Sequence, residues 1–275
     1  MNQRRRFLKS AGIGVASTVA ATGSGLVSML ASAPVASQES GSDRLYYLWR
    51  HYELAPGIGG QACDEYFSNA LIPAANRLGI RPIGAFNAWF APTEALGKYL
   101  LLPSVSLELV ANLDSNLAQD AAYVSAAEAF LASPLDRPPF VRMESTLMYA
   151  MEEFPELSIP SGAGSNPDRI FEFRTYEQPT ERAHNIKMDM FQYGEDEVLR
   201  DVGFTSIMYA KNLIGRRLPA MSYMWIYDNL DQRQQAEQEW FASEDRIDLF
   251  NQPRFSGTNS LFGNILLRPA SYSQI

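Results

Sequence analysis

The chain has 275 residues, of which 46% are apolar and 12% aromatic, so it can bury the core of one large domain or of two ordinary ones. Its formal net charge is −8, and no basic cluster follows the first nine residues, which argues against nucleic acid as a partner. Cys63 is the single cysteine, and His51 and His184 are the only histidines. We therefore expect no disulfide, no metal site and no cofactor.

Residues 1–37 have the pattern of an export signal. Three arginines at 4–6 precede the sequence FLK, and an apolar run rich in small residues follows over 11–33. Paired arginines at this place indicate twin-arginine export, whereas the many Gly, Ala, Ser and Thr residues disfavour a stable membrane anchor. We expect cleavage between Ala33 and Ser37, a periplasmic or secreted protein, and the twin-arginine translocase as its partner during export.

The two halves of the chain share landmarks in the same order. The landmarks are RHYE at 50–53 with RTYE at 174–177, Phe67 with Phe191, Gly79 with Gly203, and LPSVSLELV at 102–110 with LPAMSYMWI at 218–226. The first three pairs have the same offset of 124 residues. This order indicates a duplicated domain. We predict domains over 44–152 and 169–275, joined through a linker at 160–168 that is rich in Gly, Pro and Ser.

Hydrophobic periodicity predicts the order βαββαβ in each half. In the first half the elements are expected at 44–53, 61–78, 81–90, 104–111, 116–132 and 140–150. In the second half they are expected at 169–177, 181–202, 204–211, 220–228, 231–246 and 257–269. Gly203 is expected to end the first helix of the second half, and Asp231 to cap the second. The order is ferredoxin-like. The predicted fold class is α+β, with two such domains packed as a dimeric α/β barrel within one chain.

The alternation of the strand at 169–177 predicts two different faces. Phe171 and Phe173 lie on one face, and Glu172, Arg174 and Tyr176 lie on the other. We expect the two phenylalanines to pack on the helices. The three polar side chains would then point into the space that the two sheets share.

The strand at 44–53 has the same pattern. Arg50 and Tyr52 correspond to the arginine and tyrosine of the second half, so the two pairs are expected to meet near a pseudo-twofold axis. His51 lies on the opposite face and is expected to point toward the helices or the strand end. Because both halves belong to one chain, the barrel can close within a monomer, and the sequence leaves monomer and homodimer both open.

The second half resembles a NIPSNAP-type domain. The residues that carry this resemblance are Arg174, Tyr176, Met190-Phe191, Gly194-Glu195, Gly203, Gly215, Pro219, Tyr223, Asp228, Arg233, Arg268-Pro269 and Ser273. The first half matches loosely and lacks a counterpart of Gly194-Glu195, which makes it the poorer place to expect a ligand. The resemblance implies the dimeric α/β-barrel superfamily, whose members include cofactor-independent monooxygenases, haem enzymes and proteins without known catalysis. It implies no particular activity.

Several polar residues of the predicted barrel are candidates for binding a small organic or acidic ligand. They are Arg50, Tyr52, Glu172, Arg174, Tyr176, Ser222 and Asn264. A guanidinium offers a planar fork to a carboxylate or phenolate. The alternative is that Glu172 and Arg174 form an internal ion pair, because buried charges need partners before they need a function.

Three residues are candidates for catalysis. Glu195 could act as a general base if it is desolvated, beside Arg174 and Tyr176, although a helix glutamate is more often a solvated surface residue. His184 would need an apolar pocket to ligate haem, and its surroundings in sequence, ERAHNIK, do not indicate one.

Three classes of function follow from these candidates. The favoured hypothesis is a binding protein that holds a small ligand between its two sheets. The alternatives are a cofactor-independent monooxygenase or isomerase that uses Arg174, Tyr176 and Glu195, and a protein-interaction module with an apolar patch on its outer surface.

Overall fold

The computed structural model describes residues 44–55, 59–92, 95–258 and 260–275, and these residues belong to one compact unit. The predicted export signal at 1–37 lies outside the described residues. Within them, no helix combines the length and the apolar character needed to cross a membrane.

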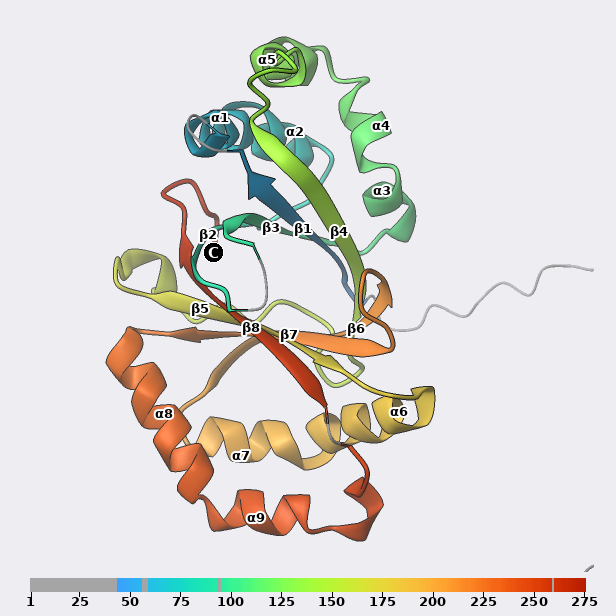
Figure 1. Cartoon of the computed structure of the whole chain (residues 1–275), viewed down its shortest axis with the longest axis vertical. Coiled ribbons are helices and arrows are strands. Elements are labelled where there is room, and N and C mark those ends of the chain that lie inside the picture. The colour runs from blue at the N-terminus through green and yellow to red at the C-terminus, as the bar shows by residue number, and fades with distance from the viewer. Residues whose placement is uncertain (1–43, 56–58, 93–94, 259) are drawn as a thin grey trace, which may run out of the picture. The chain divides into compact units, whose positions relative to one another are not determined.

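Among the described residues, eight strands form the centre of the molecule (Figure 1). They are β1 (Tyr46–Leu54), β2 (Gly84–Phe90), β3 (Gly97–Ser104), β4 (Phe140–Ala150), β5 (Ile170–Glu177), β6 (Thr205–Ile214), β7 (Ala220–Tyr227) and β8 (Leu261–Pro269). They close into a barrel in the order β1-β3-β2-β8-β5-β7-β6-β4, and every neighbouring pair is antiparallel. Each half contributes a four-stranded sheet of ferredoxin-like order. The edge strands of one sheet pair with those of the other, β2 with β8 and β4 with β6, so neither sheet keeps a free edge.

The helices of each half cover the outside of its own sheet (Figure 1). In the first half they are α1 (Gly59–Tyr66), α2 (Ile72–Arg77), α3 (Leu107–Ala111), α4 (Leu113–Leu117) and α5 (Ala121–Leu131). In the second half they are α6 (Glu181–Met190), α7 (Asp196–Asp201), α8 (Leu230–Ala242) and α9 (Glu244–Phe250). A π-helical turn joins α1 to α2 at Phe67–Leu71, and another joins α6 to α7 at Phe191–Glu195. The two turns begin 124 residues apart, as the repeat predicts.

The predicted α+β barrel fold is confirmed, and three local predictions are wrong. Residues 107–111 are helical, not part of a strand at 104–111, because the Ser106 hydroxyl accepts a hydrogen bond from the Leu109 amide and caps α3. The alignment of 102–110 with 218–226 fails for the same reason. In the second half Asn229, not Asp231, caps α8 by accepting from the Gln232 amide at 2.9 Å. Gly203 follows α7 with a φ of 95°, as its predicted role requires.

The barrel interior is filled by apolar side chains from both sheets. Trp49 of β1 and Phe173 of β5, which the repeat aligns, stack inside it with ring centroids 4.3 Å apart and planes at 12°. Phe86 and Phe171 meet edge to face beside them at 5.0 Å. The prediction that Phe171 and Phe173 pack on the helices is therefore wrong.

The polar residues of β5 and β1 point toward the helices instead of into the barrel. Tyr176 contacts Phe191 of the helix layer, and Arg174 reaches Glu237 of α8. Tyr52 likewise packs on Phe67, so the two Arg-x-Tyr pairs lie on opposite outer faces and do not meet at an axis. Both faces of these strands are covered. The bulky apolar residues lie on the interior face, where no charged partner is present, and the arginines lie on the face that the helices cover.

The central ring stack gives a test of this arrangement. Replacing Phe173 with Ala should lower the free energy of unfolding by about 3–5 kcal/mol, because it opens a cavity between two sheets. The exposed Phe90 serves as the control, and its replacement with Ala should cost about 0.5 kcal/mol. Urea unfolding curves measure both. Equal small losses would contradict the interior position of Phe173.

Candidate functional site

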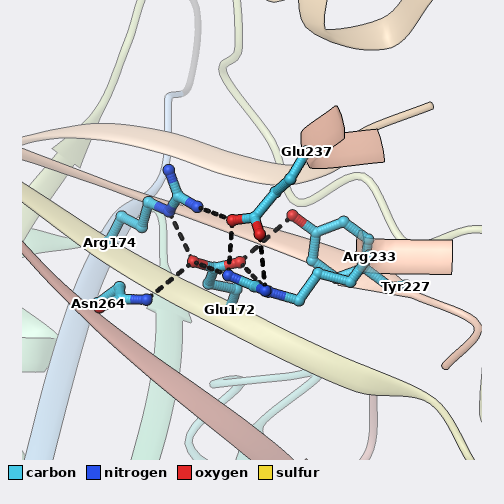
Figure 2. Close-up of polar contacts among 6 residues, drawn as sticks. All are labelled: Glu172, Arg174, Tyr227, Arg233, Glu237 and Asn264. Atoms are coloured by element: carbon cyan, nitrogen blue, oxygen red, sulfur yellow. Dashed lines mark hydrogen bonds and ion pairs between the residues drawn. The ribbon is translucent and has the colours of Figure 1, made fainter. Parts of the chain in front are cut away.

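Glu172 lies at the centre of an ion-pair network between the sheet and α8 (Figure 2). Its buried carboxylate accepts hydrogen bonds from Arg174 Nε at 2.7 Å and from Arg233 Nε at 2.7 Å. Asn264 Nδ2 donates to it at 3.3 Å, and the Tyr227 hydroxyl at 3.4 Å. Asn264 therefore faces the helices and does not line the barrel interior, contrary to its prediction as a barrel-lining ligand residue.

Glu237 of α8 completes the network. It accepts from Arg174 Nη2 at 3.0 Å and from both terminal nitrogens of Arg233, at 2.9 and 2.7 Å. Two carboxylates thus face two guanidinium groups, and the charges balance. The internal ion pair that the sequence offered as the alternative is what the structure contains. Sequence reasoning missed the partners Arg233 and Glu237, whose spacing of four residues on a helix was the available signal.

The electrostatics of Glu172 follow from these partners. Burial alone would raise the pKa of its carboxyl, but the charges of Arg174 and Arg233 outweigh burial and hold that pKa below its ordinary value. A buried carboxylate with two arginines and two further donors is stabilised where it is, and it has no need of a ligand.

Glu195 is fully buried, and it pairs with Lys187 of α6 at 2.6 Å. Burial raises the pKa of Glu195 despite this lysine. The common expectation of a solvated surface glutamate does not hold, because Leu249 of α9 packs over the π turn. Gly194 permits this approach, since a Cβ at that position would lie 2.7 Å from Leu249 Cδ1.

The three catalytic candidates lie on the same side of the second sheet. The ammonium group of Lys187, which pairs with Glu195, lies 5.3 Å from the ring centre of Tyr176, whose ring meets Tyr223 edge to face at 5.2 Å. Arg174 lies next to them in the ion-pair network. None of the three lines the two cavities described below. His184 is also buried, on α6, and lines neither of them.

The larger of these cavities lies in the first half, between the sheet and α4 and α5, and has a volume of about 510 Å³. Its walls are mainly aromatic and apolar, and they include Tyr52, Tyr66, Tyr123, Phe130, Phe140 and Met143. Arg50 lies at its base, where both terminal nitrogens donate to Asp114 at 2.9 Å. The first half, which the sequence made the poorer place to expect a ligand, thus contains an aromatic cavity beside a buried arginine. Asp114, which the sequence did not single out, lines this cavity as the partner of Arg50.

The length of one connection explains why only the first half has this cavity. In the first half, residues 132–139 lead directly from α5 to β4, and Leu135, Pro138 and Pro139 form part of the cavity wall. In the second half, the longer stretch at 243–260 contains α9. Its Leu249 and Phe255 pack against Met190 and close the corresponding space.

The second cavity lies at the end of the barrel where β1 and β5 finish, and its volume is about 80 Å³. Ser222 lines it and shares a hydrogen bond of 3.1 Å with Thr175, which agrees with its predicted interior position. His51 also lines it and stacks on Tyr99, so of the two predicted positions its side chain takes the strand end and does not face the helices. A cavity of about 80 Å³ is too small for the organic ligand expected between the sheets. Among the described residues, no three His, Cys, Asp or Glu side chains converge as a metal site.

Comparisons with known proteins show the fold. No family model matches the sequence, and no curated protein matches it. A solved structure of an anthrone oxidase-like protein superimposes with a TM-score of 0.53 at 13% identity, over 83% of this chain and 92% of that one. A candidate monooxygenase from Lactobacillus acidophilus gives 0.51 at 6% identity, over 82% of this chain and 94% of that one. These likenesses establish the dimeric α/β barrel and say nothing of the reaction.

Structural similarity to NIPSNAP proteins covers part of the chain. An uncharacterised NIPSNAP-like domain protein from Burkholderia xenovorans matches 39% of this chain and 90% of its own length, at 21% identity and a TM-score of 0.35. Membership of that family and the duplicated domains with their boundaries stay predictions.

The two buried glutamates should respond to pH with opposite signs. The pKa of Glu172 is lowered on folding, so its contribution to stability is present above the ordinary glutamate pKa and is lost as pH falls through the lowered value. The pKa of Glu195 is raised, so its contribution is present below the ordinary value and is lost as pH rises through the raised one. Free energies of unfolding measured from acid to neutral pH, for the parent, Glu172→Gln and Glu195→Gln, test this.

Relative to the parent, Glu172→Gln should lose about 3–5 kcal/mol at neutral pH and less on acidification, because it leaves two arginines facing each other. The free energy of unfolding of Glu195→Gln should increase relative to that of the parent as pH rises. The exposed Glu128→Gln is the control, with a profile parallel to that of the parent. Parallel profiles for all three variants would contradict these assignments.

Proposed function

We propose that this chain is a small-molecule-binding protein whose site is the aromatic cavity of the first half. The ligand is a mainly apolar organic molecule, with an acidic or phenolic group that reaches Arg50. The observation that carries this proposal is one cavity of about 510 Å³ that joins aromatic walls to a buried guanidinium. Its volume is in the usual range of small-molecule sites, which are mostly apolar with a few polar groups that fix orientation.

Arg50 is suited to exchange partners. Its guanidinium is buried and its Nε lacks a hydrogen-bond partner, whereas Asp114 is 66% exposed and belongs to a helix of five residues. Returning Asp114 to water costs little because it is already mostly exposed, and the ligand acid would replace it as the partner of the buried guanidinium. A ligand acid can therefore displace Asp114 from Arg50, or add to the free Nε. In the second half Arg174 lacks this freedom, because it pairs with two carboxylates that Arg233 also holds.

We propose that this binding takes place outside the cytoplasm, and the predicted export signal supports this. The twin-arginine route moves proteins that have already folded, so the barrel would form before transport. The ligand would then be one that is available in the periplasm or the medium.

A second candidate is an enzyme of the cofactor-independent monooxygenase or isomerase type. Its support is Glu195, a buried carboxyl with a raised pKa that lies on the same side as Tyr176 and Arg174, since displaced pKa values gather at catalytic sites. Under this candidate, α9 must move before a substrate reaches the group. If the purified protein binds ligands but converts none of them, the enzyme candidate fails and the binding proposal stands.

Two substitutions with opposite effects test the binding site. With 1-naphthoate as an apolar carboxylate probe, Arg50→Gln should weaken binding about 10- to 100-fold, because a charge-assisted hydrogen bond is lost. Asp114→Asn should strengthen it, because the anion no longer competes with a carboxylate for Arg50. Isothermal titration calorimetry measures both.

The exposed Arg200→Gln, which is in the second half, is the matched control and should bind like the parent. Unchanged affinity in Arg50→Gln, or weaker binding in Asp114→Asn, would contradict the proposal. The Asp114 side chain is mostly exposed, so Asp114→Asn should fold like the parent. It therefore tests the site even if Arg50→Gln fails to fold.

A further inference from the structure

The loop that follows β4 leaves a cavity beside β6. Met151 and Ser158 donate backbone hydrogen bonds to the carbonyl groups of Tyr209 and Ile207 on β6, both at 2.9 Å. Residues 152–157 leave the strand between these two anchors. The space between this loop, β6 and α7 is a cavity of about 740 Å³. Its apolar wall includes the side chains of Phe154, Leu157, Phe204 and Met208.

A chain of hydrogen bonds ends at this cavity. Trp225 Nε1 donates to the Tyr209 hydroxyl at 3.2 Å, and the Ser206 hydroxyl donates to Asp196 Oδ1 at 3.0 Å. The hydroxyl oxygens of Tyr209 and Ser206 are 2.7 Å apart. Because the hydroxyl hydrogen of Ser206 goes to Asp196, Tyr209 is the donor to Ser206. Every donor of the chain therefore points toward Asp196, a buried carboxylate in the cavity wall.

The architecture does not require this polar chain. Asp196 is the first residue after the π-helical turn of the second half, and Ile72 has the same place in the first half. Tyr209 and Ala85 also correspond, because each is in register, across one intervening strand, with the arginine of its own sheet. Ile72 and Ala85 are buried apolar residues. A buried carboxylate costs more than an apolar residue at such a place, so its position in a cavity wall indicates a binding role.

The wall of the cavity has an excess of negative charge. Among its described residues, Glu153, Glu156 and Asp196 are acidic, and Arg200 is the one basic residue. Arg200 Nε donates to Asp196 Oδ2 at 2.8 Å. Neither Glu153 nor Glu156 forms an ion pair with a described residue. Two carboxylates are therefore left without a balancing charge, which favours a cation in this cavity.

Asp196 is able to accept a further hydrogen bond. A carboxylate offers about four acceptor positions, and the bonds from Arg200 and Ser206 leave part of them open. The Asp196 side chain is 7% exposed, whereas that of Arg200 is 62% exposed. Returning Arg200 to water therefore costs little, and a ligand cation would replace it as the partner of the buried carboxylate.

We propose that this cavity is a second ligand site, separate from the aromatic cavity of the first half, for an organic cation that consists of an amine on an apolar body. The ammonium group donates to Asp196, where Glu153 and Glu156 add to the attraction, and the apolar body lies against Phe154 and Phe204. The chain would then bind an acid at a buried arginine and a base at a buried carboxylate.

Two probes of nearly equal size test the charge requirement on the full chain at neutral pH. The probe 2-phenylethylamine is a cation, and 2-phenylethanol is its neutral counterpart. Isothermal titration calorimetry should show the amine binding at least about tenfold more tightly, because only the amine forms a charge-assisted hydrogen bond with Asp196. Equal affinities, or no saturable binding of the amine, would overturn the proposal.

Two substitutions with opposite effects locate the amine. Asp196→Asn should weaken binding of 2-phenylethylamine about tenfold, and Arg200→Gln should strengthen it, because a competing cation is removed. The exposed Glu128→Gln of the first half removes the same charge as Asp196→Asn and should bind like the parent. Arg200 is mostly exposed, so Arg200→Gln tests the site even if Asp196→Asn fails to fold. Unchanged or weaker amine binding in Arg200→Gln would overturn the proposal.

Discussion

Closure of the barrel is the constraint on which the rest of the structure depends. Pairing of β2 with β8 and of β4 with β6 gives the two sheets one shared interior, which Trp49 and Phe173 fill from opposite sides. Side chains alternate along a strand, so placing these rings inside forces Arg50 and Arg174 onto the helix-covered faces. Each arginine must then find an acid on a helix. Asp114 serves Arg50, and Glu237 together with the strand residue Glu172 serves Arg174.

The two halves use this common arrangement differently. In the second half Glu172, Arg174, Arg233 and Glu237 satisfy one another, and Leu249 and Phe255 pack against Met190, so protein side chains fill the space beside Arg174. In the first half a single exposed carboxylate holds Arg50, and the short connection after α5 leaves aromatic walls around an opening. Under the proposed function, the second half supports the fold and the first half binds the ligand.

The sequence predicts the architecture well, because hydrophobic periodicity is a local signal. The order βαββαβ follows from hydrophobic periodicity, and the helix end at Gly203 follows from the residue type. The side of the sheet on which Arg174 lies cannot be predicted in this way. Both faces of a barrel strand are buried, one under helices and one under the opposite sheet. The alternation of side chains does not tell which set of residues faces the helices. The burial of Glu195 and the cavity beside Arg50 depend on α9 and on residues 132–139, which pack far from their neighbours in sequence. The capping serine at 106 was the local signal that could have corrected the strand expected at 104–111.

We propose that the first half binds the ligand and that the second half supports the fold. A crystal structure of the protein soaked with 1-naphthoate tests it most directly. The account predicts ligand density among Tyr52, Tyr66, Tyr123 and Phe130, with its carboxylate against Arg50 and no density beside Arg174. Density beside Arg174 and Glu195, or a fully protein-filled space beside Arg50, would contradict it.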